Sequence, residues 1–205
     1  MAMAKKDSMT ERGGRTREKI LGAAREVFSE SGYKDTTVSL IASRAKIGYG
    51  TVYAHFPAGK DEVLLEIMED IMGDFYEIAT AEYTPASKEE AFRFTLANTK
   101  SFLGLASLHR DWLALFYEAF GQSEMVRVRW DEITERFIAR IAKNVDIVKA
   151  KGLSRNPHYD SLVIAGSLYY PAEKYVWKIA LGKNAQSAEE IAHNIVELYT
   201  YGLFK

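Results

Sequence analysis

The stretch that decides the fold is residues 36–56, TTVSLIASRAKIGYGTVYAHF. Its apolar residues recur at helical spacing in two short runs that are separated by residues 46–48. Thr37 comes directly before the first run and is a residue type that caps helix N-termini well. The sequence therefore predicts two short helices joined by a tight turn. The side chains expected to face the core are those of Leu40, Ile41, Ala45, Ile47, Val52 and Phe56.

A longer helix is expected before this stretch. It should begin near Thr16, and Ile20, Ala24 and Phe28 lie on its apolar stripe. Gly32 can end it, because glycine readily adopts the left-handed conformation that follows many helices. Two short helices packed on a longer one form a helix-turn-helix unit, whose second short helix can lie in the major groove of DNA. The residues of that helix expected to point away from the core are Tyr49, Gly50, Thr51, Tyr53, Ala54 and His55.

This outward face is aromatic and hydroxylic. Tyrosine and threonine hydroxyls can donate to phosphate oxygens or reach base edges, and small residues let the helix backbone approach the groove closely. The alternative is a solvated helix face with no partner. That alternative does not explain two exposed tyrosines in so short a helix.

Charge is divided unevenly along the chain. Residues 1–60 hold 11 Lys and Arg against 6 Asp and Glu, a net charge of +5. The remaining residues hold 16 against 22, so the whole chain carries −1. A basic head on an acidic body indicates a polyanionic partner, while a charged tail with no partner is the alternative. Arg12, Arg15 and Arg17 precede the first helix and form either an arm that reaches the minor groove or a disordered tail.

The rest of the chain is also predicted to be helical, which makes the fold class all-α with about nine helices. A long helix is expected from Lys60 onward, joining head to body, and Ser87 and Ser187 each begin a capping-box pattern at the start of a helix. Further helices are expected at 109–121, 123–150 and 159–182. We assign residues 1–60 to a helix-turn-helix domain with its basic arm and residues 61–205 to a helical effector-binding and dimerisation domain.

A family resemblance follows from residues at fixed offsets in the first third of the chain. Residues 20–28 (ILGAAREVF), Gly32-Tyr33, residues 36–38 (TTV), residues 50–53 (GTVY) and His55-Phe56 are similar to the DNA-binding domain of the TetR family of transcriptional regulators. The resemblance spans about residues 16–66. Beyond it, only the number and order of the expected helices are similar.

The resemblance implies that Thr37 and Tyr53 contact phosphates and that His55 flanks the groove. In two places the chain departs from the family pattern. The turn has Lys46 where glycine usually takes a positive φ, and Gly48 replaces the usual hydroxyl cap. Lys60 comes one position later than the family's phosphate-contacting lysine. The candidate DNA-binding residues are Thr37, Lys46, Gly48, Tyr49, Gly50, Thr51, Tyr53, His55 and Lys60.

The body combines many aromatic residues with scattered polar ones on apolar stripes. Asn98 interrupts one such stripe, and a buried Asn needs a hydrogen-bond partner, which is either another side chain or a ligand. An aromatic stripe can be plain core, but this mixture is also typical of a small-molecule cavity. The family resemblance implies an effector in this domain. The candidate ligand-binding residues are Phe75, Asn98, Phe102, Trp112, Phe116, Tyr117, Trp130, Thr134, Phe137, Tyr170 and Trp177.

The last two expected helices have wide apolar faces. Packing the pair against a second copy buries these faces in a four-helix interface about a two-fold axis. The alternative is a monomer whose core absorbs them. The candidate interface residues are Leu162, Tyr169, Val176, Ile191, Ile195, Leu198 and Tyr199.

Together these features predict a homodimeric transcriptional repressor that a small apolar or aromatic effector releases from a pseudo-palindromic operator. A DNA-binding regulator without an effector is the first alternative, and a helical enzyme or lipid-binding protein with a vestigial head is the second. The chain contains no cysteine, and its four histidines are scattered, so we expect neither a metal site nor a cofactor. No apolar run has the length of a membrane span, so we expect a cytoplasmic protein without membrane contact.

Overall fold

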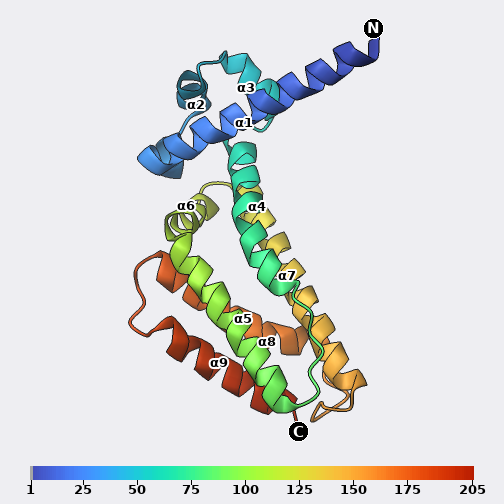
Figure 1. Cartoon of the computed structure of the whole chain (residues 1–205). Coiled ribbons are helices and arrows are strands. Elements are labelled where there is room, and N and C mark those ends of the chain that lie inside the picture. Colours follow the sequence, from blue (N-terminus) through green and yellow to red (C-terminus); the bar gives the residue numbers. More distant parts are fainter. Residues whose placement is uncertain (1) are drawn as a thin grey trace. The chain divides into compact units, whose positions relative to one another are not determined.

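The computed structural model describes the backbone of residues 2–205 and the side chains of residues 13–205, and this part of the chain is all-α (Figure 1). None of its helices is both long enough and apolar enough to cross a membrane. The helices described are α1 (Ala2–Asp35), α2 (Val38–Ala45), α3 (Tyr49–His55), α4 (Lys60–Ala79), α5 (Lys88–Leu108), α6 (Arg110–Phe120), α7 (Glu124–Ala150), α8 (Ser161–Ala180) and α9 (Ala188–Leu203).

The chain divides into two compact units. The N-terminal unit comprises residues 1–70 and 115–127, and the C-terminal unit comprises residues 71–114 and 128–205. The helices α4, α6 and α7 each contribute residues to both units. Contacts therefore continue the N-terminal unit to residue 70 and add a second segment to it, whereas the sequence suggested a division after residue 60.

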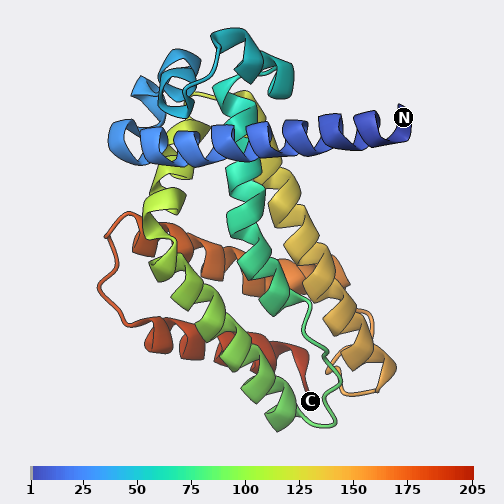
Figure 2. The same ribbon diagram turned by 45° about the horizontal axis from the view of Figure 1, so that its top comes forward.

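In the N-terminal unit, α1 begins well before Thr16, the expected start. The helix α2 packs against α1, and α3 packs against α2 (Figure 2). Gly32 has φ 70° and ψ −178°, so regular helix is interrupted there, as the sequence predicted. Of the three arginines of the expected basic arm, Arg12 lies outside the described side chains.

The helices α2 and α3 are held in place by a cap and by a shared core. The Thr37 side chain accepts a hydrogen bond from the Leu40 N–H at 3.2 Å, which confirms the predicted cap. Ile41, Val52 and Phe56 are fully buried, as expected. Leu40 is a correction, because its side chain lies on the outer face of α2 and is 46% exposed.

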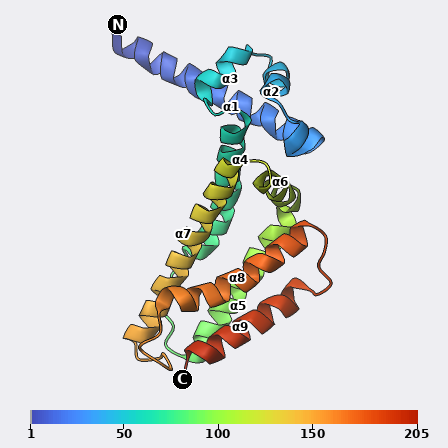
Figure 3. The same cartoon turned by 180° about the vertical axis from the view of Figure 1, so that it is seen from behind.

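The C-terminal unit is a bundle in which α5, α8 and α9 pack against one another (Figure 3). Aromatic contacts attach α7 to α8 within this unit: the ring centroids of Phe137 and Tyr169 are 5.8 Å apart, and those of Trp130 and Trp177 are 4.6 Å apart. Ser187 and Glu190 form the predicted reciprocal capping box at the start of α9.

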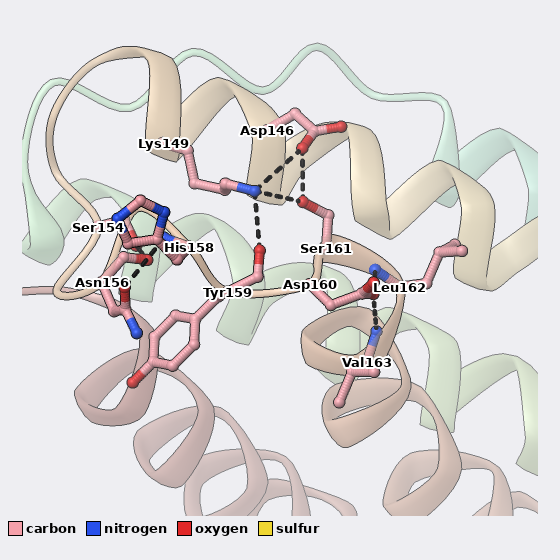
Figure 4. A network of polar contacts seen from close by, with 10 residues as sticks. All are labelled: Asp146, Lys149, Ser154, Asn156, His158, Tyr159, Asp160, Ser161, Leu162 and Val163. Atoms are coloured by element: carbon pink, nitrogen blue, oxygen red, sulfur yellow. Dashed lines mark hydrogen bonds and ion pairs between the residues drawn. The ribbon is translucent and has the colours of Figure 1, made fainter.

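The connection between α7 and α8 is fixed by polar contacts (Figure 4). The Lys149 ammonium donates to the Tyr159 carbonyl at 2.8 Å and to Ser161 Oγ at 3.3 Å. Asp160 caps α8, because its carboxylate accepts from the N–H groups of Leu162 and Val163. These bonds satisfy the free backbone donors of the first turn of α8 and set where the helix begins.

Candidate functional sites

The outer face of α3 is made of aromatic and small side chains. Tyr49 is 55% exposed and Tyr53 is 39% exposed, while Val52 is buried. The two phenol oxygens of the tyrosines lie 3.3 Å apart, and their ring centroids are 5.1 Å apart. The bond to Tyr49 raises the pKa of Tyr53 above the ordinary value of tyrosine, which is itself neutral at physiological pH. Gly50 on the same helix is also exposed, and a Cβ added there would meet nothing within 4 Å.

In the turn before α3, Lys46 adopts the positive φ that glycine usually takes at this position in the family pattern. Lys46 is exposed and has φ 53° and ψ 48°, and among the described residues other than glycine it alone has positive φ. Gly48 precedes α3 without a side-chain cap. Thr51 and His55 are both half-buried. The exposed Lys46 ammonium is therefore displayed beside the outer face of α3.

The Lys60 ammonium is bound to other groups of the protein and is not free at the surface. Its ammonium lies 2.7 Å from the Tyr33 carbonyl oxygen, 3.0 Å from that of Thr36 and 3.4 Å from that of Lys34. It also stands 4.2 Å from the centroid of the Tyr33 ring. The carbonyls at the end of α1 would otherwise lack partners, so Lys60 caps this helix.

Two arginines hold α2 and α3 to the rest of the N-terminal unit. Arg17 donates to the His55 carbonyl at 3.0 Å, pairs with Glu66 and stacks 4.3 Å from the Phe56 ring centroid. Arg17 therefore fixes the C-terminal end of α3, a role that its expected place in a basic arm did not suggest. Arg15 is exposed on α1.

The second arginine is Arg44. It donates to the carboxylates of Glu26 at 2.9 Å and of Glu30 at 2.6 Å, which ties α2 to α1.

The segment 115–127 binds the end of α1 within the same unit. The Glu118 carboxylate accepts from the N–H groups of Tyr33 at 3.2 Å and Lys34 at 3.1 Å, directly after Gly32. Asp61 accepts from the hydroxyls of Tyr33 at 2.7 Å and Ser123 at 2.6 Å. The partners Glu118 and Tyr33 are 85 residues apart, so no local pattern could have predicted this contact.

A cavity of about 90 Å³ lies within the C-terminal unit. It is mostly apolar, and no Lys, Arg, Asp or Glu lines it. The lining residues are Ile78, Ala79, Tyr83, Phe94, Thr95, Asn98, Thr99, Phe102, Phe137, Ile141, Asn144, Leu168, Tyr169, Ala172 and Tyr199.

Two polar side chains of this lining have a weak hydrogen bond or none. The Asn98 amide donates to the Ile78 carbonyl over a long 3.5 Å. Tyr199 is only 8% exposed, and in the described part of the chain no group hydrogen-bonds its hydroxyl. Burial raises the pKa of Tyr199, and it raises that of Tyr83 to about 12. The cavity wall therefore offers neutral donors and acceptors.

Three of the eleven residues predicted to bind a ligand line this cavity, namely Asn98, Phe102 and Phe137. Phe75 stands behind Phe102 at a centroid distance of 5.0 Å. Thr134 lies 3.5 Å from the hydroxyl of the lining residue Tyr169. The predicted residues that fall elsewhere are Trp112, Phe116, Tyr117, Trp130, Tyr170 and Trp177.

Of these, Phe116 and Tyr117 belong to the N-terminal unit, and Tyr170 is exposed. Trp130 and Trp177 pack together, and Trp130 Nε1 donates to Glu173 at 2.7 Å. Sequence reasoning missed Tyr83 and Asn144. Asn144 carried a usable signal, because it continues the helical spacing of the apolar pair Phe137 and Ile141.

The residues predicted to form an interface fall into two groups. Leu162 and Leu198 are 55% and 78% exposed. The exposed apolar side chains Val163, Tyr170 and Tyr201 are on the same two helices, α8 and α9. The other predicted residues are buried within the chain itself, namely Tyr169, Val176, Ile191, Ile195 and Tyr199.

Comparison with known proteins places these sites in a family context. Residues 20–67 match the family model of bacterial regulatory proteins, tetR family. The chain is 39% identical over 119 residues to the fatty acid metabolism regulator protein of Bacillus subtilis (strain 168), a match that covers 58% of this chain and 60% of that protein. It spans between 26% and 60% of the length of the first three curated relatives it matches.

Solved structures share the fold over nearly the whole chain. One is a SmeT–triclosan complex, with a TM-score of 0.71, 20% identity and coverage of 93% of this chain and 92% of that one. Another is a transcriptional regulator from Saccharomonospora viridis in complex with choline, with a TM-score of 0.67, 18% identity and coverage of 94% and 99%. At these identities the likeness concerns the fold alone.

Proposed function

Because the chain belongs to the TetR family of bacterial regulatory proteins, we propose that it is a DNA-binding transcriptional repressor that acts in the bacterial cytoplasm. The observation that carries this proposal is the outer face of α3, an exposed surface whose helix is held by the buried Val52 and Phe56 and by the hydrogen bond from Arg17 to the His55 carbonyl. A rigidly held short helix suits insertion into the major groove, since binding then costs little ordering.

The side chains around α3 take distinct roles in this proposal. Tyr49, Gly50 and Ala54 meet the base edges, and Tyr53 and Lys46 contact phosphates beside them. Lys46 is exposed on the turn, which supports its role. Thr37 contributes its hydroxyl at the start of α2, where phosphate contacts are common for this motif.

We further propose that two copies act together through the exposed apolar side chains of α8 and α9. Leu162 and Leu198 carry this interface together with Val163, Tyr170 and Tyr201. Burial of these side chains against a second copy removes apolar surface from water, and a two-fold axis then presents two α3 helices to an inverted-repeat operator.

The cavity in the C-terminal unit is the proposed effector site. Its uncharged lining favours a neutral, largely apolar or aromatic molecule with one or two hydrogen-bonding groups, which Tyr199 and Asn98 can meet. A dry cavity that holds benzene has about 150 Å³. At about 90 Å³, this cavity must widen for an aromatic effector, and that displacement of its wall is how binding alters the protein.

Selection from a library of random duplexes tests the DNA-binding role. We expect the wild-type protein to enrich an inverted repeat. Tyr49→Ala should relax the preference at particular positions. Tyr53→Ala should mainly weaken binding to every sequence, with a smaller loss of preference because its ring packs against that of Tyr49. Wild-type binding without any sequence preference would contradict the proposal.

A cavity-filling variant tests the effector role. Ala172 lines the cavity, so Ala172→Leu should fill it while leaving operator binding intact. In a thermal-shift screen of neutral aromatic molecules, a ligand at 100 times its Kd should stabilise the wild type by about 2.7 kcal/mol and the variant much less. Equal shifts in both proteins would place the ligand elsewhere, and no shift with any compound would favour a regulator without an effector.

A further inference from the structure

The recognition surface of α3 lacks the side chains that usually identify bases by hydrogen bonding. Arg and Lys pair with guanine, Asn and Gln with adenine, and Asp and Glu with cytosine. None of these six residue types occurs in Tyr49–His55. The helix α3 therefore cannot discriminate bases through charged or amide side chains of its own.

The centre of the outer face of α3 is formed by the Ala54 methyl group and by the backbone of Gly50, which has no side chain. With 100° between successive residues of a helix, Ala54 lies directly opposite the buried pair Val52 and Phe56. Gly50 lies one turn earlier on the same side, with open space where a Cβ would be. The part of α3 that can enter the groove most deeply is thus apolar and nearly flat.

A tyrosine ring forms the edge of this face. The Tyr49 hydroxyl is bound to that of Tyr53, which in turn lies against the backbone of Gly59. A Cβ at Gly59 would approach the Tyr53 ring to 3.4 Å, and Gly59 has φ 68°, so a larger residue there would be strained. The Tyr49 ring also packs against the Tyr53 ring, with their centroids 5.1 Å apart, and this ring contact positions the exposed carbon surface of Tyr49.

The cations near α3 do not replace the missing base-reading side chains. Arg17 is bonded to the His55 carbonyl and to Glu66. Arg44 is bonded to Glu26 and Glu30 on α1. Lys60 is bonded to the carbonyls that end α1. Lys46 is exposed, but it lies on the turn before α3, at the edge of the surface, where phosphates are within its reach.

We propose that α3 reads its half-site mainly through thymine C5-methyl groups, which pack against the Ala54 methyl and the Tyr49 ring. Thymine is the base that presents an apolar group in the major groove, and alanine and aromatic side chains are suited to contact it. This inference rests on the proposed DNA-binding function and specifies the chemistry that the surface recognises. It predicts A·T pairs, with thymine in a defined strand, at the positions that α3 touches.

Deoxyuridine substitution tests this directly, because it removes the methyl group and leaves the base-pairing edge unchanged. Each thymine of the selected operator is replaced by deoxyuridine in both half-sites, and affinity is measured by fluorescence anisotropy. One buried methyl group contributes about 0.8 kcal/mol, or about fourfold in affinity. Replacing a contacted thymine in both half-sites should therefore lower operator affinity by about 16-fold. Thymines outside the contact should tolerate the change.

Protein variants assign each methyl group to its reader. Tyr49→Phe keeps the ring and should retain the deoxyuridine penalty, while Tyr49→Ala should abolish it at one position of each half-site. Ala54→Gly should abolish the deoxyuridine penalty at another position. Ala54→Ser serves as a second variant at this residue, because serine favours the helix more than glycine does. Thermal unfolding checks that each variant is folded.

Two further outcomes would count against the inference in different ways. A strong sequence preference that survives replacement of every thymine by deoxyuridine would overturn methyl recognition while leaving DNA binding intact. A wild-type protein that enriches no sequence at all would overturn the proposed function itself, and the methyl inference with it.

Discussion

The two units of this protein use polar groups in opposite ways. In the N-terminal unit, the charged side chains around the helix ends are paired: Lys60 binds three carbonyls, and Glu118 binds two N–H groups. In the C-terminal unit, the cavity wall leaves Tyr199 unbonded among the described residues and gives Asn98 one long bond. Polar groups that are fully paired fix the position of the α3 surface. Polar groups of the cavity wall that lack partners remain able to bind a ligand.

Helix length explains why the N-terminal unit needs this pairing. The recognition helix α3 has 7 residues, too few to be stable alone in water. Its position depends on the burial of Val52 and Phe56 and on the contact of Arg17 with its last carbonyl. The helices around the cavity have 16 to 27 residues, so they can keep their structure beside unfilled space.

The largest expected difference between the units comes from matched phenylalanine truncations. Phe56→Ala removes a fully buried ring, which should cost about 3–5 kcal/mol and release α3. Phe102→Ala removes a half-buried ring that borders the cavity, and should cost only about 2 kcal/mol, since its surroundings are already loosely filled. Urea unfolding followed by circular dichroism measures both losses. Equal losses would show that the cavity wall is packed as tightly as the core under α3.

A second pair of variants separates a structural lysine from a DNA-contacting one. Lys60→Ala should cost about 1.5–3 kcal/mol, because the carbonyls at the end of α1 lose a charged donor. Lys46→Ala should leave stability within about 0.5 kcal/mol, since its side chain is exposed. In operator binding, Lys46→Ala should lower the slope of log affinity against log salt by about 0.9 per lost phosphate contact, and Lys60→Ala should not. A reduced slope for Lys60→Ala would restore the role that the family resemblance implies.

These lysines also show what sequence could predict. Thr37 as a cap and Val52 and Phe56 as core follow from local spacing, and all three are confirmed. The positive φ at Lys46 is the conformation that the family resemblance implies for this position. The capping of α1 by Lys60 depends on carbonyls 24 to 27 residues away, which no local pattern encodes. Leu40 was wrongly expected to be buried, because the stripe of a two-turn helix is too short to fix which edge faces the core.

The cavity was harder to predict for a different reason. Aromatic residues mark the C-terminal unit as a candidate for ligand binding, but they do not reveal where packing fails to fill space. Asn98, Phe102 and Phe137 line the cavity, whereas Trp130 and Trp177 pack against each other instead. A void is the difference between the volumes of side chains from several helices, so it emerges only from their assembly.

Two glycines give a smaller effect that sharpens the contrast between a surface that functions and one that does not. Gly50 on α3 and Gly104 on α5 are both exposed helical positions with nothing within 4 Å of an added Cβ. Gly50→Ala and Gly104→Ala should each stabilise the chain by about 0.5–1 kcal/mol. Only Gly50→Ala should weaken operator binding, by about fivefold or more, since a methyl forced into a packed contact costs about 1–3 kcal/mol. Thermal unfolding and anisotropy measure the two effects, and unchanged operator affinity in Gly50→Ala would mean that the α3 backbone does not approach the groove.

The smallest effect is a pH dependence of opposite sign in the two units. Burial raises the pKa of Glu173 in the C-terminal unit above its usual value near 4.5, although Trp130 donates a hydrogen bond to it. The folded state then holds a proton that the unfolded state has lost, so this group lowers stability as pH rises above 4.5. The bond from Arg44 lowers the pKa of Glu30 in the N-terminal unit, so the contribution of Glu30 to stability is present above pH 4.5 and is lost as pH falls below it.

Compared with the wild type, Glu173→Gln should have a higher Tm near neutral pH. Glu30→Gln should have a lower Tm near neutral pH that converges with the wild type in acid. Melting curves between pH 3 and 7 test both, and a parallel shift of both variants at every pH would show that neither carboxyl titrates differently on folding.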